Sequence, residues 1–200
     1  MKKYIISFVL ALAVVILVAG VMVLTSNMTA RATPGTSETW IATTLRSLAM
    51  PRDERTQVNP FAANESILKE AGEHFADHCA SCHANDGSGN TALGRNLSPR
   101  VPDMRLAATQ SKSDGELYYV IHNGIRFSGM PAWGAEGKDD DSWKLVLFIR
   151  HLPQLTTDEI KEMQKYNPKS DAERAEEQEE QDFLNGKPVS PSSAERLHQH

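Results

Sequence analysis

The sequence predicts an all-α protein, and three observations lead to this fold class. Apolar side chains recur three or four residues apart in segments 64–79 and 142–152, which is the spacing of one face of a helix. Two capping boxes, Ser113 with Glu116 and Thr156 with Glu159, mark further helix starts. Residues 5–24 form a long run without a charged side chain. Together these observations predict a small helical domain with an apolar N-terminal helix and a helical or disordered C-terminal tail.

The N-terminal run, residues 5–24, predicts a transmembrane anchor. A helix of this length spans about 30 Å, the hydrocarbon thickness of a bilayer. Lys2 and Lys3 precede it, so the positive-inside rule places the N-terminus in the cytoplasm and the rest of the chain outside. A cleaved signal peptide is the alternative, because Ala30-Arg31-Ala32 has the small-residue pattern of a cleavage site. The apolar run is longer than a signal peptide's apolar region, which favours the uncleaved anchor.

Residues 25–63 are predicted to be a linker. They contain Pro34, Pro51 and Pro60, and their apolar residues show no sustained periodicity. Within this linker, a short helix is expected over residues 37–49. Its apolar residues have near-helical spacing; they are Trp40, Ile41, Leu45 and Leu48. The sequence does not decide whether this helix docks on the membrane or on the following domain.

Residues 64–155 are the predicted folded domain, and residues 156–200 are an acidic tail. The tail holds 6 basic and 11 acidic side chains, whereas the domain holds 9 basic and 12 acidic ones. The acidic composition of the tail is typical of a solvated helix followed by a disordered end. A docking arm for a basic partner or a membrane complex is the alternative interpretation of the tail. Neither segment has the basic stripe of a nucleic-acid-binding protein.

The motif Cys79-Ala80-Ser81-Cys82-His83 carries the chemistry of the chain, and it contains both of the cysteines in the sequence. The pattern Cys-x-x-Cys-His is typical of c-type haem attachment, in which two thiols form thioether bonds and the histidine binds the iron. A structural zinc site would require four ligands, and no second cysteine pair is present. A thioredoxin-like redox motif would lie near a βαβ pattern, which the helical surroundings do not provide.

The domain's first helix should begin at Asn64 as N-cap and carry the motif at its far end. Gly72 costs this helix about 1 kcal/mol, so we expect a packing reason such as close approach by another helix. The expected partner is segment 142–152. The aspartates at 139–141, directly before this segment, suit a helix start. The glycine- and proline-rich segment 84–105 is predicted to be an irregular loop, ordered by a bound haem.

Met130 is the expected sixth iron ligand, because it lies in the turn Gly129-Met130-Pro131 and offers a soft, neutral thioether. A methionine that only fills a gap in the core is the alternative. Met104 is the rival methionine and His122 the rival histidine. His74 and His78, four residues apart, are more simply explained as solvated helix residues than as a metal site.

Residues 64–155 resemble a class I c-type cytochrome. The resemblance is carried by the attachment motif, by Gly72 and Phe75 in the first helix, by Phe148 in the last helix, and by the methionine loop. It implies a small cytochrome c fold of a few helices around one haem c, with His83 and Met130 as axial ligands. It also implies that the carbonyl of Pro99 or Pro102, with Pro102 preferred, accepts a hydrogen bond from His83 Nδ1.

The expected function is one-electron transfer by a membrane-tethered carrier, which is not itself an enzyme. Its haem domain would lie on the periplasmic side of the cytoplasmic membrane, and its partners would be membrane respiratory or dehydrogenase complexes. One alternative is a haem c subunit of a larger membrane oxidoreductase complex. Another is a haem peroxidase or gas sensor in which Met130 leaves the iron.

Overall fold

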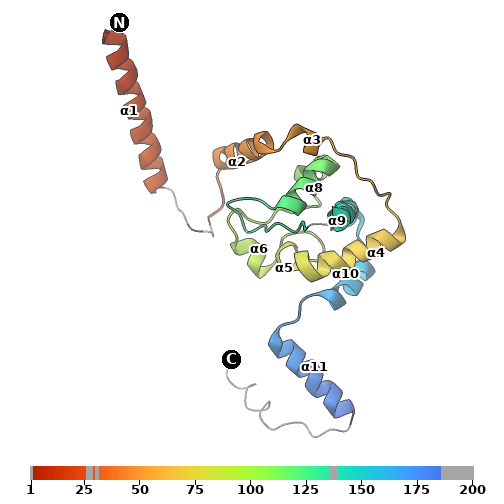
Figure 1. Ribbon diagram of the computed structural model, residues 1–200. Coiled ribbons are helices and arrows are strands. Elements are labelled where there is room, and N and C mark those ends of the chain that lie inside the picture. Colours follow the sequence, from red (N-terminus) through yellow and green to blue (C-terminus); the bar gives the residue numbers. More distant parts are fainter. Residues whose placement is uncertain (1, 26–28, 30–31, 136–138, 186–200) are drawn as a thin grey trace, which may run out of the picture.

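A computed structural model describes residues 2–25, 29, 32–135 and 139–185. Over these residues the chain is helical, and no strand is formed (Figure 1), which confirms the predicted all-α class. The first two residues of the candidate cleavage site, Ala30 and Arg31, lie outside the described residues, as does the end of the tail, 186–200.

The helices begin with an apolar segment that is long enough to cross a membrane, and none of the qualifying stretch is buried within the protein. This agrees with the predicted N-terminal anchor. The helical segments in chain order are α1 (Lys2–Thr25), α2 (Thr36–Ala49), α3 (Arg52–Arg55), α4 (Glu65–His74), the π-helical η1 (Phe75–Cys79), α5 (Ala80–His83), α6 (Ala92–Asn96), α7 (Ala107–Gln110), α8 (Asp114–Asn123), α9 (Asp139–His151), the 3-10 segment η2 (Leu152–Gln154), α10 (Thr157–Met163), the 3-10 segment η3 (Gln164–Tyr166) and α11 (Asp171–Leu184).

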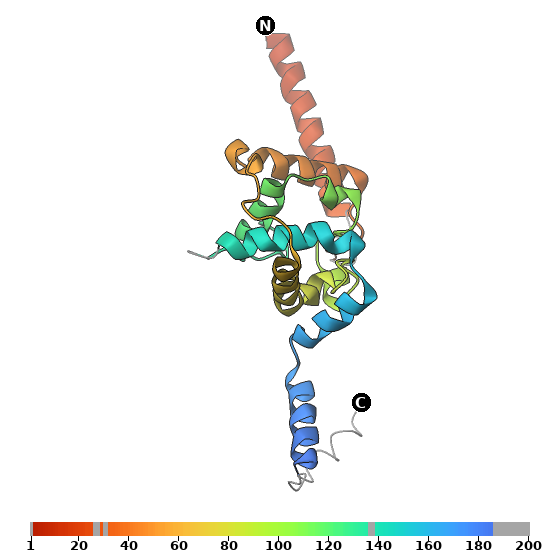
Figure 2. The same cartoon turned by 90° about the vertical axis from the view of Figure 1, so that its right-hand side faces the viewer.

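Helix α9 crosses the middle of the domain and packs on α4 at one side and on α8 at the other (Figures 1 and 2). The contact with α4 is made at Gly72, where a Cβ atom would lie 3.0 Å from Cε2 of Phe148. The expected close approach between segment 142–152 and Gly72 is therefore confirmed. The predicted N-cap is also present, because Asn64 Oδ1 accepts a hydrogen bond from the Ile67 amide at 3.0 Å.

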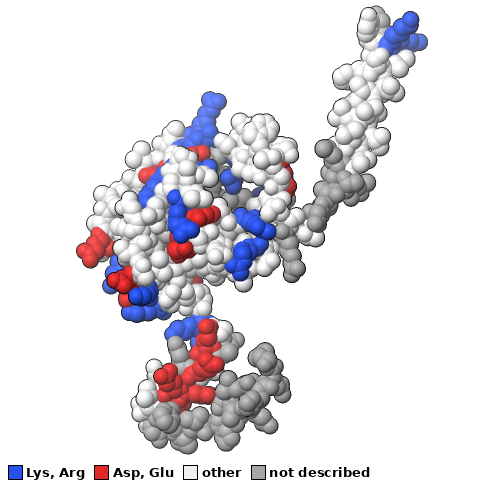
Figure 3. Space-filling model, turned by 180° about the vertical axis from the view of Figure 1, so that it is seen from behind, with Lys and Arg blue, Asp and Glu red and all other residues white. Residues whose placement is uncertain are grey.

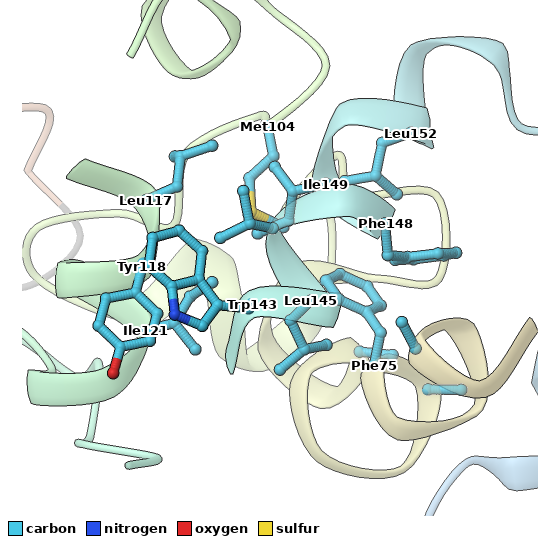
Figure 4. Packing of buried hydrophobic residues seen from close by; sticks show 14 of the residues in the cluster. Phe75, Met104, Leu117, Tyr118, Ile121, Trp143, Leu145, Phe148, Ile149 and Leu152 are labelled. Carbon is cyan, nitrogen blue, oxygen red and sulfur yellow. The ribbon is translucent and has the colours of Figure 1, made fainter. Parts of the chain in front are cut away.

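Aromatic rings fill the two contact faces of α9. Trp143 stacks on Tyr118 of α8 with ring centroids 4.1 Å apart, and Phe148 lies 5.2 Å from Phe75, also centroid to centroid. Figure 4 shows these side chains converging from α8, η1 and α9, and Met104 and Leu152 belong to the same buried cluster. The core is thus continuous from α8 to the segment that carries the cysteines.

The segment before the domain packs on it through α3. Ser113 Oγ donates a hydrogen bond to the Arg55 carbonyl at 2.7 Å, and Ser113 also forms the predicted capping box with Glu116. A Cβ on Gly115 would lie 2.2 Å from the Glu54 carbonyl oxygen, so only glycine permits this contact. The end of the predicted linker is therefore part of the packed structure.

Packing also continues past residue 155, where the sequence analysis places the start of the tail. Met163 of α10 is buried in the core, and His151 Nε2 lies 2.8 Å from Glu159 Oε1. The predicted capping box of Thr156 and Glu159 starts this helix. Beyond it, acidic side chains gather on α11, whereas the domain surface carries both signs of charge (Figure 3).

Candidate functional site

A π-helical turn, η1, precedes the Cys-x-x-Cys-His motif directly. The Ala80 amide donates to the Phe75 carbonyl, five residues earlier, instead of four as in an α-helix. Phe75 and Ala76 are buried in the core by this turn, whereas Cys79, Cys82 and His83 are only partly covered. Single π-helical turns are frequent at functional sites, because they re-aim the side chains that follow.

The two cysteines are free thiols rather than a disulfide. Burial, with a further contribution from the neighbouring Cys82 thiol, raises the pKa of Cys79 to about 12. Redox-active Cys-x-x-Cys motifs lower the pKa of their attacking thiol, so the surroundings of Cys79 act in the opposite direction. The pair is therefore unsuited to thiol–disulfide exchange, and both sulfur atoms are available for another use.

His83 is held as a neutral imidazole, because burial lowers its pKa to about 4. A neutral imidazole is the form that binds a metal. Nδ1 of His83 is buried and has no hydrogen-bond partner among the described residues. Buried polar atoms without partners are rare, so this nitrogen marks the ring as a candidate ligand.

The hydrogen bond that the resemblance implies between His83 Nδ1 and a proline carbonyl is not formed in this structure. The preferred acceptor, the Pro102 carbonyl, lies instead beside Gly89, 3.2 Å from the place a Cβ would occupy there. The loop reaches His83 through its backbone, because the Gly89 amide donates to the His83 carbonyl at 2.8 Å.

Segment 84–105 folds back onto the motif through contacts that the sequence analysis did not identify. Thr91 Oγ1 donates to the Cys82 carbonyl at 3.2 Å and accepts from the Gly94 amide at 2.8 Å. A Cβ on Gly94 would lie 2.4 Å from the Cys82 carbonyl oxygen and 2.6 Å from that of Gly89. Thr91 is the N-cap of α6, which is the one sequence signal that could have identified it.

Met130 lies half-buried in a tight loop after α8. Its carbonyl accepts from the Ile125 amide at 3.1 Å, and its amide donates to Ser128 Oγ at 3.1 Å. Gly124, with φ of 68°, ends α8, and a Cβ there would collide with the backbone of Pro131. The loop that presents Met130 is therefore fixed by its own backbone.

One contact joins this loop to the cysteine segment, and another joins it to segment 84–105. The Trp133 ring meets the His78 ring edge to face, with centroids 5.4 Å apart. On the other side, Gly129 lies against the Leu97 side chain, because a Cβ on it would be 2.7 Å from Leu97 Cδ2. The loop that carries Met130 thus touches the cysteine segment at His78 and segment 84–105 at Leu97.

The rival ligands have other surroundings. Met104 is buried in the hydrophobic core. The His122 ring stacks on Tyr118 with centroids 5.1 Å apart and fills the space above Gly134. The His74 and His78 rings contact each other at 4.8 Å between centroids, and within the described part of the chain no three metal-binding side chains gather.

Comparison with known proteins points to the same segment. Residues 67–149 match the family model described as cytochrome c oxidase, cbb3-type, subunit III. The chain is also similar to the cbb3-type cytochrome c oxidase subunit FixP of Rhizobium meliloti (strain 1021), with 32% identity over 87 residues. That alignment covers 43% of this chain and 28% of FixP, so the chain spans little more than a quarter of its relative.

The matched segment contains the π-helical turn, the two free thiols, the neutral histidine and the methionine loop. It is all-helical, as a small cytochrome c domain is, and it follows an N-terminal helix that qualifies as a membrane span. Residues 67–149 therefore resemble a class I c-type cytochrome domain, as the sequence motifs predicted.

Proposed function

We propose that this protein is a one-electron carrier that holds a single haem c, bound through Cys79 and Cys82, with His83 and Met130 as the axial ligands. The proposal rests on one observation. Two free thiols and a neutral imidazole lie within residues 79–83, where η1 passes into α5. A haem bound in this way would supply one-electron chemistry by cycling its iron between Fe(III) and Fe(II).

Each residue of the site has a separate role in this proposal. The thioether bonds of Cys79 and Cys82 keep the group in place when an axial bond weakens. His83 offers an unprotonated ring nitrogen, because burial disfavours the charged imidazolium. A methionine opposite a histidine raises the reduction potential relative to a second histidine. Met130 suits this role because its loop is fixed before any ligand binds.

The surroundings of the rival side chains support Met130. Withdrawing Met104 from the core would leave a cavity, and loss of a buried methionine side chain costs about 2–5 kcal/mol. Turning His122 toward an iron would break its stacking on Tyr118. Met130 makes its loop hydrogen bonds through the backbone, so a ligand role of its side chain would break none of them.

The proposed partner is a membrane respiratory complex of the oxidase type, since the relative that this chain resembles is named as an oxidase subunit. Lys2 and Lys3 before α1 favour a cytoplasmic N-terminus and therefore a haem domain on the periplasmic side. The anchor would keep the carrier at the membrane and raise its effective concentration near such a complex. The protein would then pass electrons to an enzyme without being the catalytic component.

The test is the optical spectrum of the full chain after haem maturation in a bacterial periplasm, recorded oxidised, reduced, and reduced with carbon monoxide. We expect a low-spin reduced spectrum that carbon monoxide does not change. Met130→Leu should bind carbon monoxide in nearly every molecule, because leucine has no sulfur to hold the sixth position.

Met104→Leu is the matched control, and it should keep the spectrum of the unmutated protein. Carbon monoxide binding by the unmutated protein would favour the peroxidase or gas-sensor alternative. Binding by Met104→Leu and not by Met130→Leu would show that the ligand assignment is wrong.

A further inference from the structure

Helix α2 exposes its large apolar side chains. Trp40, Ile41, Leu45 and Leu48 are 68%, 50%, 61% and 76% exposed, and no residue of the helix is buried. The residues of α2 that are partly covered are polar, namely Thr44, Arg46 and Ser47. An ordinary surface helix turns its apolar stripe toward the core, so α2 has the reverse arrangement.

The end of α2 fixes this orientation with respect to the domain. Met50, directly after the helix, is buried, and the Arg55 guanidinium donates a hydrogen bond to the Ser47 carbonyl. Because α3 is packed on α8 through Gly115, α2 cannot rotate freely about its axis. The apolar face is therefore a fixed feature of the domain surface.

The chain itself limits what can cover this face. Segment 26–35 joins α1 to α2, and ten residues reach at most about 35 Å when fully extended. The start of α2 consequently stays within about 35 Å of the end of α1, and so within reach of the membrane that α1 crosses. A tryptophan beside aliphatic side chains is typical of helices that lie in the headgroup region.

We infer that the face formed by Trp40, Ile41, Leu45 and Leu48 lies in the headgroup and upper acyl region of the bilayer, parallel to its surface. The inference rests on anchorage by α1, which is part of the proposed function. It makes α2 a second attachment that holds the cytochrome domain in one orientation on the membrane, which anchorage by α1 alone would leave undetermined.

The experiment uses the full, haem-loaded chain in nanodiscs that hold one chain each, in a mixture of zwitterionic and anionic phospholipids. A nitroxide label is attached at Leu45→Cys or Leu48→Cys after haem maturation, when Cys79 and Cys82 no longer present thiols. Collision of the label with oxygen, which enters lipid, is compared with collision with a water-soluble nickel chelate. The controls are labels at Val58→Cys and Leu106→Cys. The native side chains at these two positions are 82% and 59% exposed.

We expect the ratio of oxygen to nickel collisions to be several-fold higher at positions 45 and 48 than at the two controls. Equal ratios at all four positions would overturn the inference. Protection from nickel that appears only in discs with several chains would also overturn it, because a second copy would then cover the face. Co-elution with the disc tests anchorage by α1, and the visible spectrum tests the haem, so failure of the proposed function is recognised separately.

Discussion

Burial shifts the pKa values of two ionisable side chains of the site. The same loss of water that lowers the pKa of His83 to about 4 raises that of Cys79 to about 12. Both groups are therefore uncharged at neutral pH, and the apolar core formed by Phe75 and Phe148 lies directly behind them. An uncharged, apolar lining of this kind suits a large apolar cofactor such as a porphyrin.

Gly94 is the residue where the loop after His83 depends most on the absence of a side chain. In Gly94→Ala the better helix propensity of alanine would contribute about 1 kcal/mol in favour of α6. The new methyl group would meet two backbone carbonyl oxygens at 2.4 and 2.6 Å, which neither segment can avoid without moving. We expect the steric term to dominate and the free energy of unfolding to fall by about 1–3 kcal/mol.

Denaturant unfolding of the full chain in detergent, followed by tryptophan fluorescence, measures this change. Gly35→Ala is the matched control, because the nearest atom to its added Cβ is 4.0 Å away. The control should stay within about 0.5 kcal/mol of the unmutated protein. A Gly94→Ala protein as stable as the control would mean that the loop does not pack on the Cys82 carbonyl.

The sequence was informative about residues whose role depends on close neighbours in the chain. The spacing of Cys79, Cys82 and His83 was enough to identify the motif. The hydrogen bond between Thr91 and the Cys82 carbonyl was not predicted, because it joins residues whose approach is set by the whole path of the loop. The hydrogen bond expected between His83 Nδ1 and the Pro102 carbonyl is not formed. Its prediction was wrong for the same reason, because the direction of a carbonyl depends on the fold of the whole loop.

Among the elements, the crossing of α4 and α9 determines the shape of the domain. Gly72 lets the Phe148 ring approach the α4 backbone, as the 3.0 Å distance to a built Cβ shows. Gly72→Val would insert three carbon atoms into this contact. We expect the helices to separate and the free energy of unfolding to fall by about 1–3 kcal/mol.

Ser66→Val is the comparison for this substitution, because Ser66 is an exposed position of the same helix. It carries the cost of a β-branched side chain in a helix without the steric conflict. Thermal unfolding of both variants, followed by circular dichroism, separates the two effects. Equal loss of stability in the two variants would show that the α4–α9 contact is not tight.

Helix starts were predicted well because capping is local: Asn64, Ser113 and Thr156 all cap helices as expected. The π-helical turn η1 was not predicted. Apolar spacing alone suggested an uninterrupted helix through Cys79, whereas the structure has a π-helical turn from Phe75 to Cys79, directly before the rest of the motif.

At the scale of the whole molecule, the packed unit is larger than the segment that resembles a cytochrome. Met50 on one side and Met163 on the other are both buried, although they lie in the predicted linker and tail. The sequence placed these segments outside the domain because residues 25–63 show no sustained periodicity and residues 156–200 are strongly acidic. The proposed membrane contact of α2 gives the N-terminal addition a role in orienting the domain.

A redox titration of the visible absorption tests whether one covalently held haem makes this chain a one-electron carrier. The full, matured chain should follow a single transition, in which the ratio of oxidised to reduced protein changes tenfold for about every 59 mV. Absorption that does not respond to potential, or a transition with the two-electron slope of about 30 mV, would contradict the account.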